Sequence, residues 1–196
     1  VRKAVNELEN DGLVVKKQGK GTYVSFPKLS HNLPKLSSFT EDIESKGLIP
    51  ESKIINIREV DNAKIAKKLG IAEDTTLLRV KRLRLINDEK IGIHDCYLNT
   101  SLLSEAKVSQ IKRMTCDSSL YDIIEEKDAI KISYADETLE GGISQDDISN
   151  LLHIEDGFPL LVLERLTYTS NNNAIEYVKM YYRADKYKYS IRLQRD

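Results

Sequence analysis

The sequence predicts an α+β fold in which helices flank an antiparallel sheet. Residues 69–83, LGIAEDTTLLRVKRL, align with residues 152–166, LHIEDGFPLLVLERL, at a constant offset of 83 residues. Each copy follows a short helical segment and precedes a second strand-like run, KIGIHDCYL (90–98) or AIEYVKMYYR (174–183). Two helix–strand–strand units in one chain predict a single antiparallel sheet with pseudo-twofold symmetry.

The composition is typical of a globular protein of the cytoplasm. Of the 196 residues, 40% are hydrophobic and 31% are charged, which suffices for a core. No apolar run approaches the roughly 20 residues needed to span a bilayer, and no secretion signal is visible. Cys96 and Cys116 form no C-x-x-C pair, so we expect a reducing compartment. Because the chain opens at Val1 inside a helical pattern, we also expect its natural N-terminus to be missing.

Residues 1–26 predict a helix followed by a hairpin. Ala4, Val5 and Leu8 have helical spacing, and Gly12 is placed to end the helix. The β-rich runs LVVKK (13–17) and GTYVSF (21–26) are joined by QGKG, in which Gly19 and Gly21 can adopt a positive φ. The turn between the runs would carry Lys20 at its exposed tip.

The charge distribution sets this first segment apart. Residues 1–26 carry five basic and three acidic groups, whereas the remainder carries 25 basic and 28 acidic groups. A helix that leads into a basic hairpin is the second half of a winged helix, whose hairpin, the wing, would contact DNA. The alternative is an ordinary solvated hairpin with surface lysines.

Three segments follow from these patterns. Residues 1–26 are expected to be the end of a winged-helix domain, and residues 27–36, which contain two of the four prolines, a semi-rigid linker. Residues 37–196 form the α+β domain. Within its two repeats we expect one helix to be capped by Asp61 or Asn62 and the other by a capping box of Ser144 and Asp147.

Charged residues interrupt the apolar faces of two predicted strands. In TLLRVKRLRLI (76–86), Arg82 and Arg84 share a face with Leu78 and Val80, because side chains two apart point the same way. Burying an unpaired arginine costs much free energy, so we expect an anion to lie against this face.

In the last predicted hairpin, Glu176 and Tyr182 share a face with Val178 and Met180 in the same way. Two hypotheses stay open: a ligand pocket between the halves, or a structural ion pair of Glu176 with one of the two arginines.

Two helix starts could complete an anion site. SSFTEDIESKG (37–47) offers Ser38 or Thr40 as an N-cap, and DSSLYDIIEEK (117–127) offers Ser118 or Ser119. Free N–H groups at helix starts bind phosphate or carboxylate, although capping without a ligand is the commoner role.

These motifs together resemble one bacterial family. The stretch VRKAVNELENDGLVVKKQGKGTYV is similar to the end of the DNA-binding domain of GntR-type regulators of the HutC subfamily. The stretches SFTEDI, RLRL, SLYDIIEEK, LLVLERLTY and IEYVKMYYRADKY resemble that subfamily's effector-binding (UTRA) domain, which has the chorismate lyase fold. The resemblance implies an effector-responsive repressor that acts as a homodimer on operator DNA, is not an enzyme and needs no cofactor.

The resemblance also implies roles for individual residues. Arg2, Lys3, Gly19 and Lys20 would contact DNA. In relatives that sense amino-sugar phosphates, the phosphate is held at positions matching Thr40, Arg82, Arg84, Ser119 and Tyr121. The sugar is held at positions matching Phe39, Glu176 and Tyr182, and at a glutamate where this chain has His94. An imidazole can donate a hydrogen bond where a carboxylate only accepts, so the preferred sugar should differ.

Other functions have weaker support in the sequence. His31, His94 and His153 with the two cysteines show no metal-ligand spacing. Asp95 points to the opposite face of its strand from His94 and cannot orient that imidazole. The fold is also an enzyme fold, so a lyase-like enzyme acting on a small carboxylate remains an alternative. Another is a repressor that senses a non-sugar anion such as a fatty acid, a histidine catabolite or a phosphonate.

Overall fold

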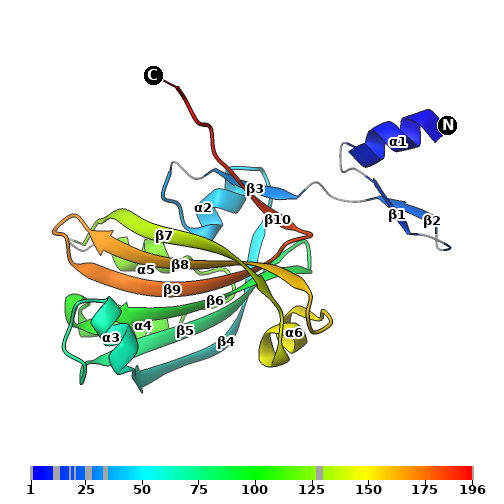
Figure 1. The fold of residues 1–196 in the computed structure, drawn as a ribbon. Helices are drawn as coiled ribbons and strands as arrows, with labels where there is room; N and C mark the ends of the chain where they lie inside the picture. The colour runs from blue at the N-terminus through cyan, green and yellow to red at the C-terminus, as the bar shows by residue number, and fades with distance from the viewer. Residues whose placement is uncertain are drawn as a thin grey trace.

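Six strands form the main sheet of the protein. The computed structural model describes residues 2–10, 14–17, 19, 21–24, 28–32, 35–126 and 130–195. The strand order is β4-β5-β6-β9-β8-β7 and every neighbouring pair is antiparallel (Figure 1). The strands are β4 (Pro50–Asp61), β5 (Thr76–Ile86), β6 (Glu89–Asn99), β7 (Ile132–Ile143), β8 (Pro159–Thr169) and β9 (Ala174–Arg183). The predicted fold class is confirmed.

The sheet consists of two halves with the same order of elements. One half runs β4, α3 (Ala63–Lys68), β5 and β6; the other runs β7, α6 (Asp146–Leu152), β8 and β9. The halves meet where β6 pairs with β9. The sequence repeat therefore extends one strand further towards the N-terminus than expected: β4 and β7 were missed because these edge strands expose many polar side chains.

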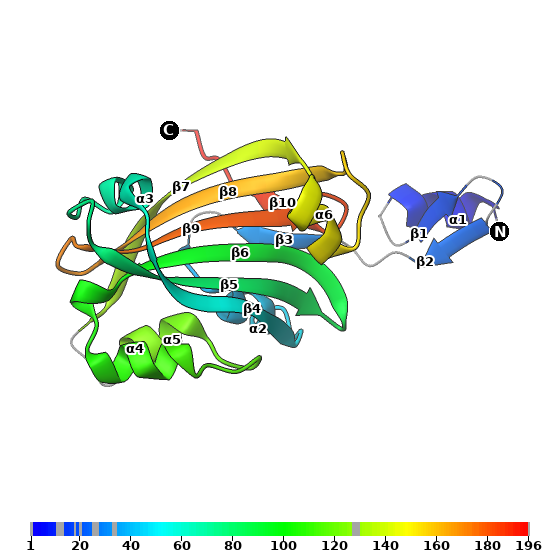
Figure 2. The same cartoon turned by 90° about the horizontal axis from the view of Figure 1, so that it is seen from below.

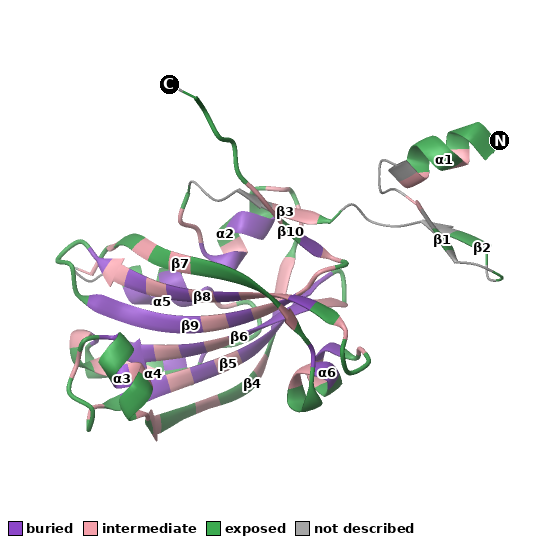
Figure 3. Cartoon of the chain, in the orientation of Figure 1, coloured by how far each residue is buried: buried purple, intermediate pink, exposed green. Residues whose placement is uncertain are grey.

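Helices cover the two faces of the sheet unequally (Figure 2). One face carries α2 (Phe39–Glu44), α4 (Glu105–Lys112) and α5 (Leu120–Glu125), with the 3-10 turn η1 (Thr100–Leu102) before α4. The other face carries α3 and α6 near opposite ends. The strands in the middle of the sheet are buried, whereas the edge strand β7 is largely exposed (Figure 3).

The main core fills the space between the sheet and α2, α4 and α5. Ile43, Val80, Ile111, Ile124 and Leu163 are all fully buried in it. Each fully buried aliphatic side chain contributes about 1.5–3 kcal/mol relative to its exposed state. This packing supports the face of the sheet on which Arg82 and Arg84 lie.

Side-chain caps begin most of these helices. Ser38 and Glu41 form a reciprocal capping box at α2, and Ser119 Oγ accepts from the Asp122 N–H at α5. At α3 the cap is Asn62, and Asp61 belongs to β4.

The capping box expected at α6 was wrong. The N-cap there is Gln145, which makes no side-chain bond. Ser144 Oγ instead donates to the Glu155 carbonyl and accepts from the Phe158 N–H, so it braces the following loop.

A short strand lies within the range expected to be a linker. β3 (Leu29–Asn32) pairs in parallel with β10 (Tyr187–Ser190), and the Leu29 N–H donates to the Lys186 carbonyl at 2.9 Å. The segment expected to be a linker is thereby paired with the end of the α+β domain, a non-local pairing with no signal in either short segment.

The N-terminal segment contains α1 (Arg2–Asn10) and the hairpin of β1 (Val14–Lys17) and β2 (Gly21–Val24), as predicted. Arg2 and Lys3 are exposed, and Gly19 has a φ of 74°. Lys16 Nζ bonds Asn6 and, at 2.6 Å, Glu9, so this lysine ties the helix to the hairpin. The expected helix end at Gly12 and the wing residue Lys20 lie outside the described residues. In the described part of the chain, no helix is long and apolar enough to cross a membrane.

Candidate functional site

The register of the four central strands gathers the polar side chains on one face. Arg82 on β5 lies opposite His94 on β6, which lies opposite Met180 on β9. At the other end of this face, Glu176 on β9 lies opposite Thr167 on β8. The shared faces inferred from alternation are confirmed.

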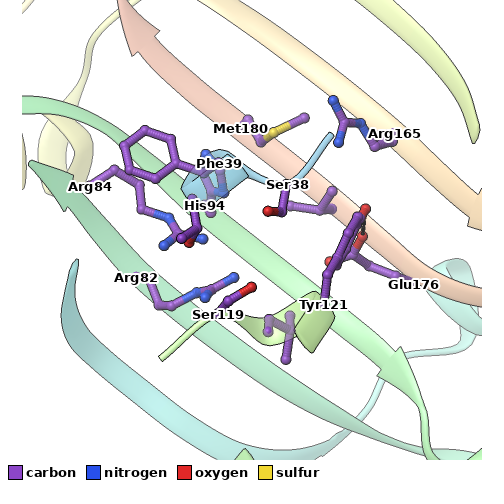
Figure 4. Close-up of a pocket in the computed structure, with 13 residues that line it drawn as sticks. Ser38, Phe39, Arg82, Arg84, His94, Ser119, Tyr121, Arg165, Glu176 and Met180 are labelled. Carbon is purple, nitrogen blue, oxygen red and sulfur yellow. Dashed lines mark hydrogen bonds between the residues drawn. The ribbon is translucent and has the colours of Figure 1, made fainter. Parts of the chain in front are cut away.

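A small cavity lies between this face and the starts of α2 and α5 (Figure 4). Its volume is about 30 Å³. Eight of the nine residues predicted for effector binding line it: Phe39, Thr40, Arg82, Arg84, His94, Ser119, Tyr121 and Glu176. The ninth, Tyr182, does not line the cavity but is hydrogen-bonded to His94, which does. In Figure 4 the two arginines lie on one side, and Tyr121 and Glu176 on the other.

The arginine pair is buried without adequate partners. Both side chains are 3% exposed. Arg82 Nε and Nη1 and Arg84 Nε have no hydrogen-bond partner, whereas Arg84 Nη1 donates to Ser52 Oγ at 2.5 Å. The Phe39 ring lies 4.8 Å from the Arg84 guanidinium carbon. Burial lowers the pKa of Arg82, and burial together with Arg82 lowers that of Arg84 further. A buried anion would satisfy these orphaned donors.

Glu176 belongs to a different network. Its Oε2 accepts hydrogen bonds from the Tyr121 hydroxyl at 2.9 Å and the Thr167 hydroxyl at 3.0 Å, and its Oε1 accepts from Cys96 Sγ at 3.0 Å. Burial and the glutamate raise the pKa of the Cys96 thiol well above its usual value, so the thiol remains a donor. No ion pair within 4.0 Å joins this carboxylate to Arg82 or Arg84 in the described chain. The alternative of a structural Glu176–arginine pair is therefore wrong.

His94 occupies the centre of the face. Its Nε2 lies 2.6 Å from the Tyr182 hydroxyl, and the Phe39 ring meets it edge-on at 5.6 Å. Burial, followed by the positive charges of Arg84, Arg82 and Arg165, lowers the pKa of His94 well below 6.5. The imidazole is therefore neutral at pH 7 and can offer a ligand either a donor or an acceptor.

Two polar lining residues were not among the nine predicted effector contacts: Ser38, which was named only as a possible helix cap, and Arg165. Arg165 Nε donates to Glu137 Oε2 at 2.6 Å, and its Nη1 donates to the Ser37 carbonyl at 3.2 Å. A signal was available, because Arg165 is the residue that the 83-residue offset aligns with Arg82.

The opposite face of the sheet holds no part of this site. Asp95 points there, as predicted, and accepts both guanidinium bonds of Arg79 at 2.7 and 2.6 Å. Among the described residues no cluster of His, Cys, Asp and Glu could hold a metal ion. Cys96 and Cys116 are both free thiols.

Comparison with known proteins identifies the family. Residues 45–188 match the family described as "UTRA domain". The chain is 36% identical to the HTH-type transcriptional repressor NagR of Bacillus subtilis (strain 168), over 96% of this chain and 76% of NagR. It is 23% identical to the probable fructoselysine utilization operon transcriptional repressor of Escherichia coli (strain K12), over 97% of this chain and 77% of that repressor.

Solved structures share the fold. The crystal structure of PhnF from Mycobacterium smegmatis superposes with a TM-score of 0.83 at 22% identity, over 100% of this chain and 84% of PhnF. The two relatives are described as transcriptional repressors, in agreement with the expectation of a regulator and not an enzyme. The chain belongs to the UTRA-domain transcriptional repressors of the GntR family.

Proposed function

We propose that this repressor is released from its operator by a small phosphorylated sugar, with an amino-sugar phosphate favoured, bound in the cavity between the sheet and α2 and α5. The observation that carries the proposal is the buried, incompletely bonded pair Arg82 and Arg84. Three guanidinium nitrogens without partners match a group with several anionic oxygens, because charge-assisted hydrogen bonds to phosphate are about twice as strong as neutral ones.

The phosphate would lie against the arginines and the hydroxyls of Thr40, Ser119 and Tyr121. All five residues line the cavity. Tyr121 donates its hydroxyl proton to Glu176 and contacts the Thr167 hydroxyl, so its ring is positioned before a ligand arrives and the proton would turn from the carboxylate to the phosphate on binding. A positioned side chain loses little entropy on binding, which favours affinity.

The sugar would occupy the remainder of the cavity, near Phe39, His94 and Glu176, with Tyr182 holding the imidazole. Glu176 supplies an acceptor for sugar hydroxyl or amine groups, and the neutral His94 supplies a donor or an acceptor. The E. coli relative is described as a repressor for fructoselysine utilization, which is consistent with a sugar-derived effector.

The cavity must widen to admit this ligand. Its volume is about 30 Å³, whereas ligand sites typically measure about 300–1,000 Å³. Ser38, Phe39 and Thr40 form part of its cover and belong to the start of α2. Binding would therefore displace α2, which follows β3 and the N-terminal segment. A coupling of about 1–3 kcal/mol is typical of such effects.

The N-terminal segment would supply the DNA contacts. Arg2 and Lys3 on α1 and Gly19 with Lys20 in the hairpin are the proposed contact residues. Two copies of the chain would read a two-fold operator in the cytoplasm, since paired half-sites call for paired readers.

A thermal-shift panel tests the effector. The ligands are glucosamine 6-phosphate, N-acetylglucosamine 6-phosphate, glucose 6-phosphate, the three unphosphorylated sugars and urocanate. A ligand at 100 times its Kd adds about 2.7 kcal/mol of stability, or roughly 5–10 °C in a chain of this size. We expect shifts from phosphorylated sugars alone. If only urocanate or another carboxylate shifts the midpoint, the effector is a non-sugar anion.

A further inference from the structure

Tyr182, the hydrogen-bond partner of His94, is packed between the backbone of Gly92 and the ring of Tyr187. Gly92 lies opposite Tyr182 in the sheet, and a Cβ at Gly92 would lie 2.5 Å from Tyr182 Cδ1. On its other side the Tyr182 ring stacks on Tyr187 with centroids 4.0 Å apart and planes inclined by 4°. Both tyrosines are 3% exposed. The position of the Tyr182 hydroxyl, 2.6 Å from His94 Nε2, thus depends on Gly92 and Tyr187.

Tyr187 also contacts the helix that covers the cavity. Its hydroxyl donates to Asp42 Oδ2 at 3.4 Å. Asp42 lies in α2, one turn after the cavity-lining start of that helix, and is bonded by Lys46 as well. Movement of α2 therefore acts on the same tyrosine ring that supports Tyr182.

The backbone of Tyr187 reaches the segment that leads to the DNA-binding part. Tyr187 is the first residue of β10 and is paired with Leu29, the first residue of β3. β3 follows the N-terminal hairpin in the chain, and β10 is the strand to which it is bonded in the described residues. Tyr187 thus contacts Tyr182, the hydrogen-bond partner of the cavity-lining His94, through its ring. It contacts α2 through its hydroxyl and β3 through its backbone.

We propose that Tyr187 is a positioning residue that transmits displacement of Tyr182 and α2 to β3, and so couples the effector cavity to the N-terminal segment. The proposal rests on the proposed function for the identity of the effector but not for the mechanical link. Stacked rings and paired strands are tightly packed and have few alternative arrangements. A shift of Tyr182 or α2 should therefore move Tyr187 and, through β10, the paired strand β3.

Hydrogen exchange of the β3 amides, residues 29–32, tests the link without any ligand. A Cβ at Gly92 would also lie 2.6 Å from the Tyr181 carbonyl oxygen, so Gly92→Ala displaces both the Tyr182 ring and the adjoining backbone of β9. We expect it to speed β3 exchange by about fivefold or more, the lower end of a typical coupling. In a Tyr187→Leu background, which exchanges faster from the start, Gly92→Ala should add less than about twofold. Tyr187→Phe keeps the stacked ring and should preserve most of the response.

The proposal is overturned if Gly92→Ala speeds β3 exchange equally in both backgrounds or in neither. Should the alanine variant fail to fold, Tyr182→Leu removes the ring and supplies the same comparison.

A second arm adds N-acetylglucosamine 6-phosphate. The ligand should alter β3 exchange in the wild type and in Tyr187→Phe but not in Tyr187→Leu, at saturating concentrations confirmed by calorimetry. An equal response in Tyr187→Leu would contradict the link. If the wild type binds no phosphorylated sugar, the proposed function fails, and the ligand-free arm still decides the role of Tyr187.

Discussion

The two halves of the sheet place an arginine at the same point of the repeat and give it opposite surroundings. Arg82 in β5 and Arg165 in β8 are separated by the 83-residue offset, and each lies on the face covered by α2 and α5. Arg82 has two guanidinium nitrogens without partners. Arg165 is bonded to Glu137 on the neighbouring edge strand and to the Ser37 carbonyl.

The difference arises from the edge strands. β7 supplies Glu137 beside Arg165. β4, at the equivalent place in the first half, supplies Ile54 beside Arg82. Burial opposes ionisation of Arg165, but Tyr121 and Glu137 outweigh it and raise its pKa, whereas burial lowers the pKa of Arg82. One half therefore neutralises its arginine internally, and the other leaves a cation that only an external anion can satisfy.

The largest expected effect is on the paired arginine. Arg165→Met would leave the Glu137 carboxylate, whose side chain is 15% exposed, without its partner. Breaking a buried pair from one side costs about 3 kcal/mol at the lower end of the measured range. Urea unfolding should show this loss as a lower midpoint with an unchanged slope. The double variant Arg165→Met, Glu137→Gln should recover much of the lost stability. If Arg165→Met alone is as stable as the wild type, Arg165 does not have this structural role.

The unpaired arginine should behave in the opposite way. Arg82→Met removes a buried charge with orphaned donors, so the free energy of unfolding should rise by about 1–3 kcal/mol. The same variant should lose at least about 100-fold in affinity for N-acetylglucosamine 6-phosphate, since several charge-assisted bonds disappear. Calorimetry measures the affinity and urea unfolding the stability.

Arg79→Met is the matched control for Arg82→Met. Arg79 lies in the same strand, on the opposite face, and is paired with Asp95. Its replacement should leave the affinity unchanged. If Arg82→Met is destabilised as Arg165→Met is, the comparison breaks down and Arg82 has a structural role.

Those features of the fold and the site that depend on local periodicity could be predicted from the sequence. Alternation along β5 and β9 placed Arg82, Arg84 and Glu176 on one face, and short-range rules included Ser38 and Ser119 among two candidate caps for each helix. The family resemblance, more than the pattern, selected Thr40 and Tyr121 as site residues. All of these positions line the same cavity.

The features that escaped prediction depend on pairing between distant segments. β3 meets β10 about 160 residues away, and the Cys96–Glu176 bond follows from the register of β6 against β9. The partner of Arg165 could not be identified without knowing that β7 pairs with β8. Single-strand periodicity therefore found the charged face but could not tell which arginine was already neutralised.

The next prediction concerns the residue opposite each arginine in the sheet. His94 lies opposite Arg82, whereas the apolar Val178 lies opposite Arg165. The pKa of His94 is lowered in the folded state, so below about pH 6.5 the unfolded chain binds a proton that the folded chain excludes. Stability should fall as the pH drops from 7.5 to 5.5, with at most about 1.4 kcal/mol per pH unit from this group.

His94→Gln should flatten that part of the pH profile of unfolding. His153→Asn is a suitable control, because His153 is exposed and its left-handed φ of 54° suits asparagine. An identical slope in His94→Gln and the wild type would show that His94 is not the group responsible. Bound phosphate should reduce the slope, because its charge opposes that of the arginines around the imidazole.

The smallest expected effect concerns the N-caps of α3 and α6, which the 83-residue offset also aligns. Asn62 caps α3 by accepting from the Ile65 N–H at 3.2 Å, whereas its counterpart Gln145 makes no cap bond at α6. Asn62→Ala should therefore cost about 1 kcal/mol, or 2–4 °C in melting temperature. Gln145→Ala should stay within about 0.5 kcal/mol. Equal losses in the two variants, measured by thermal unfolding, would mean that the halves are more alike in solution than the Arg82 and Arg165 environments indicate.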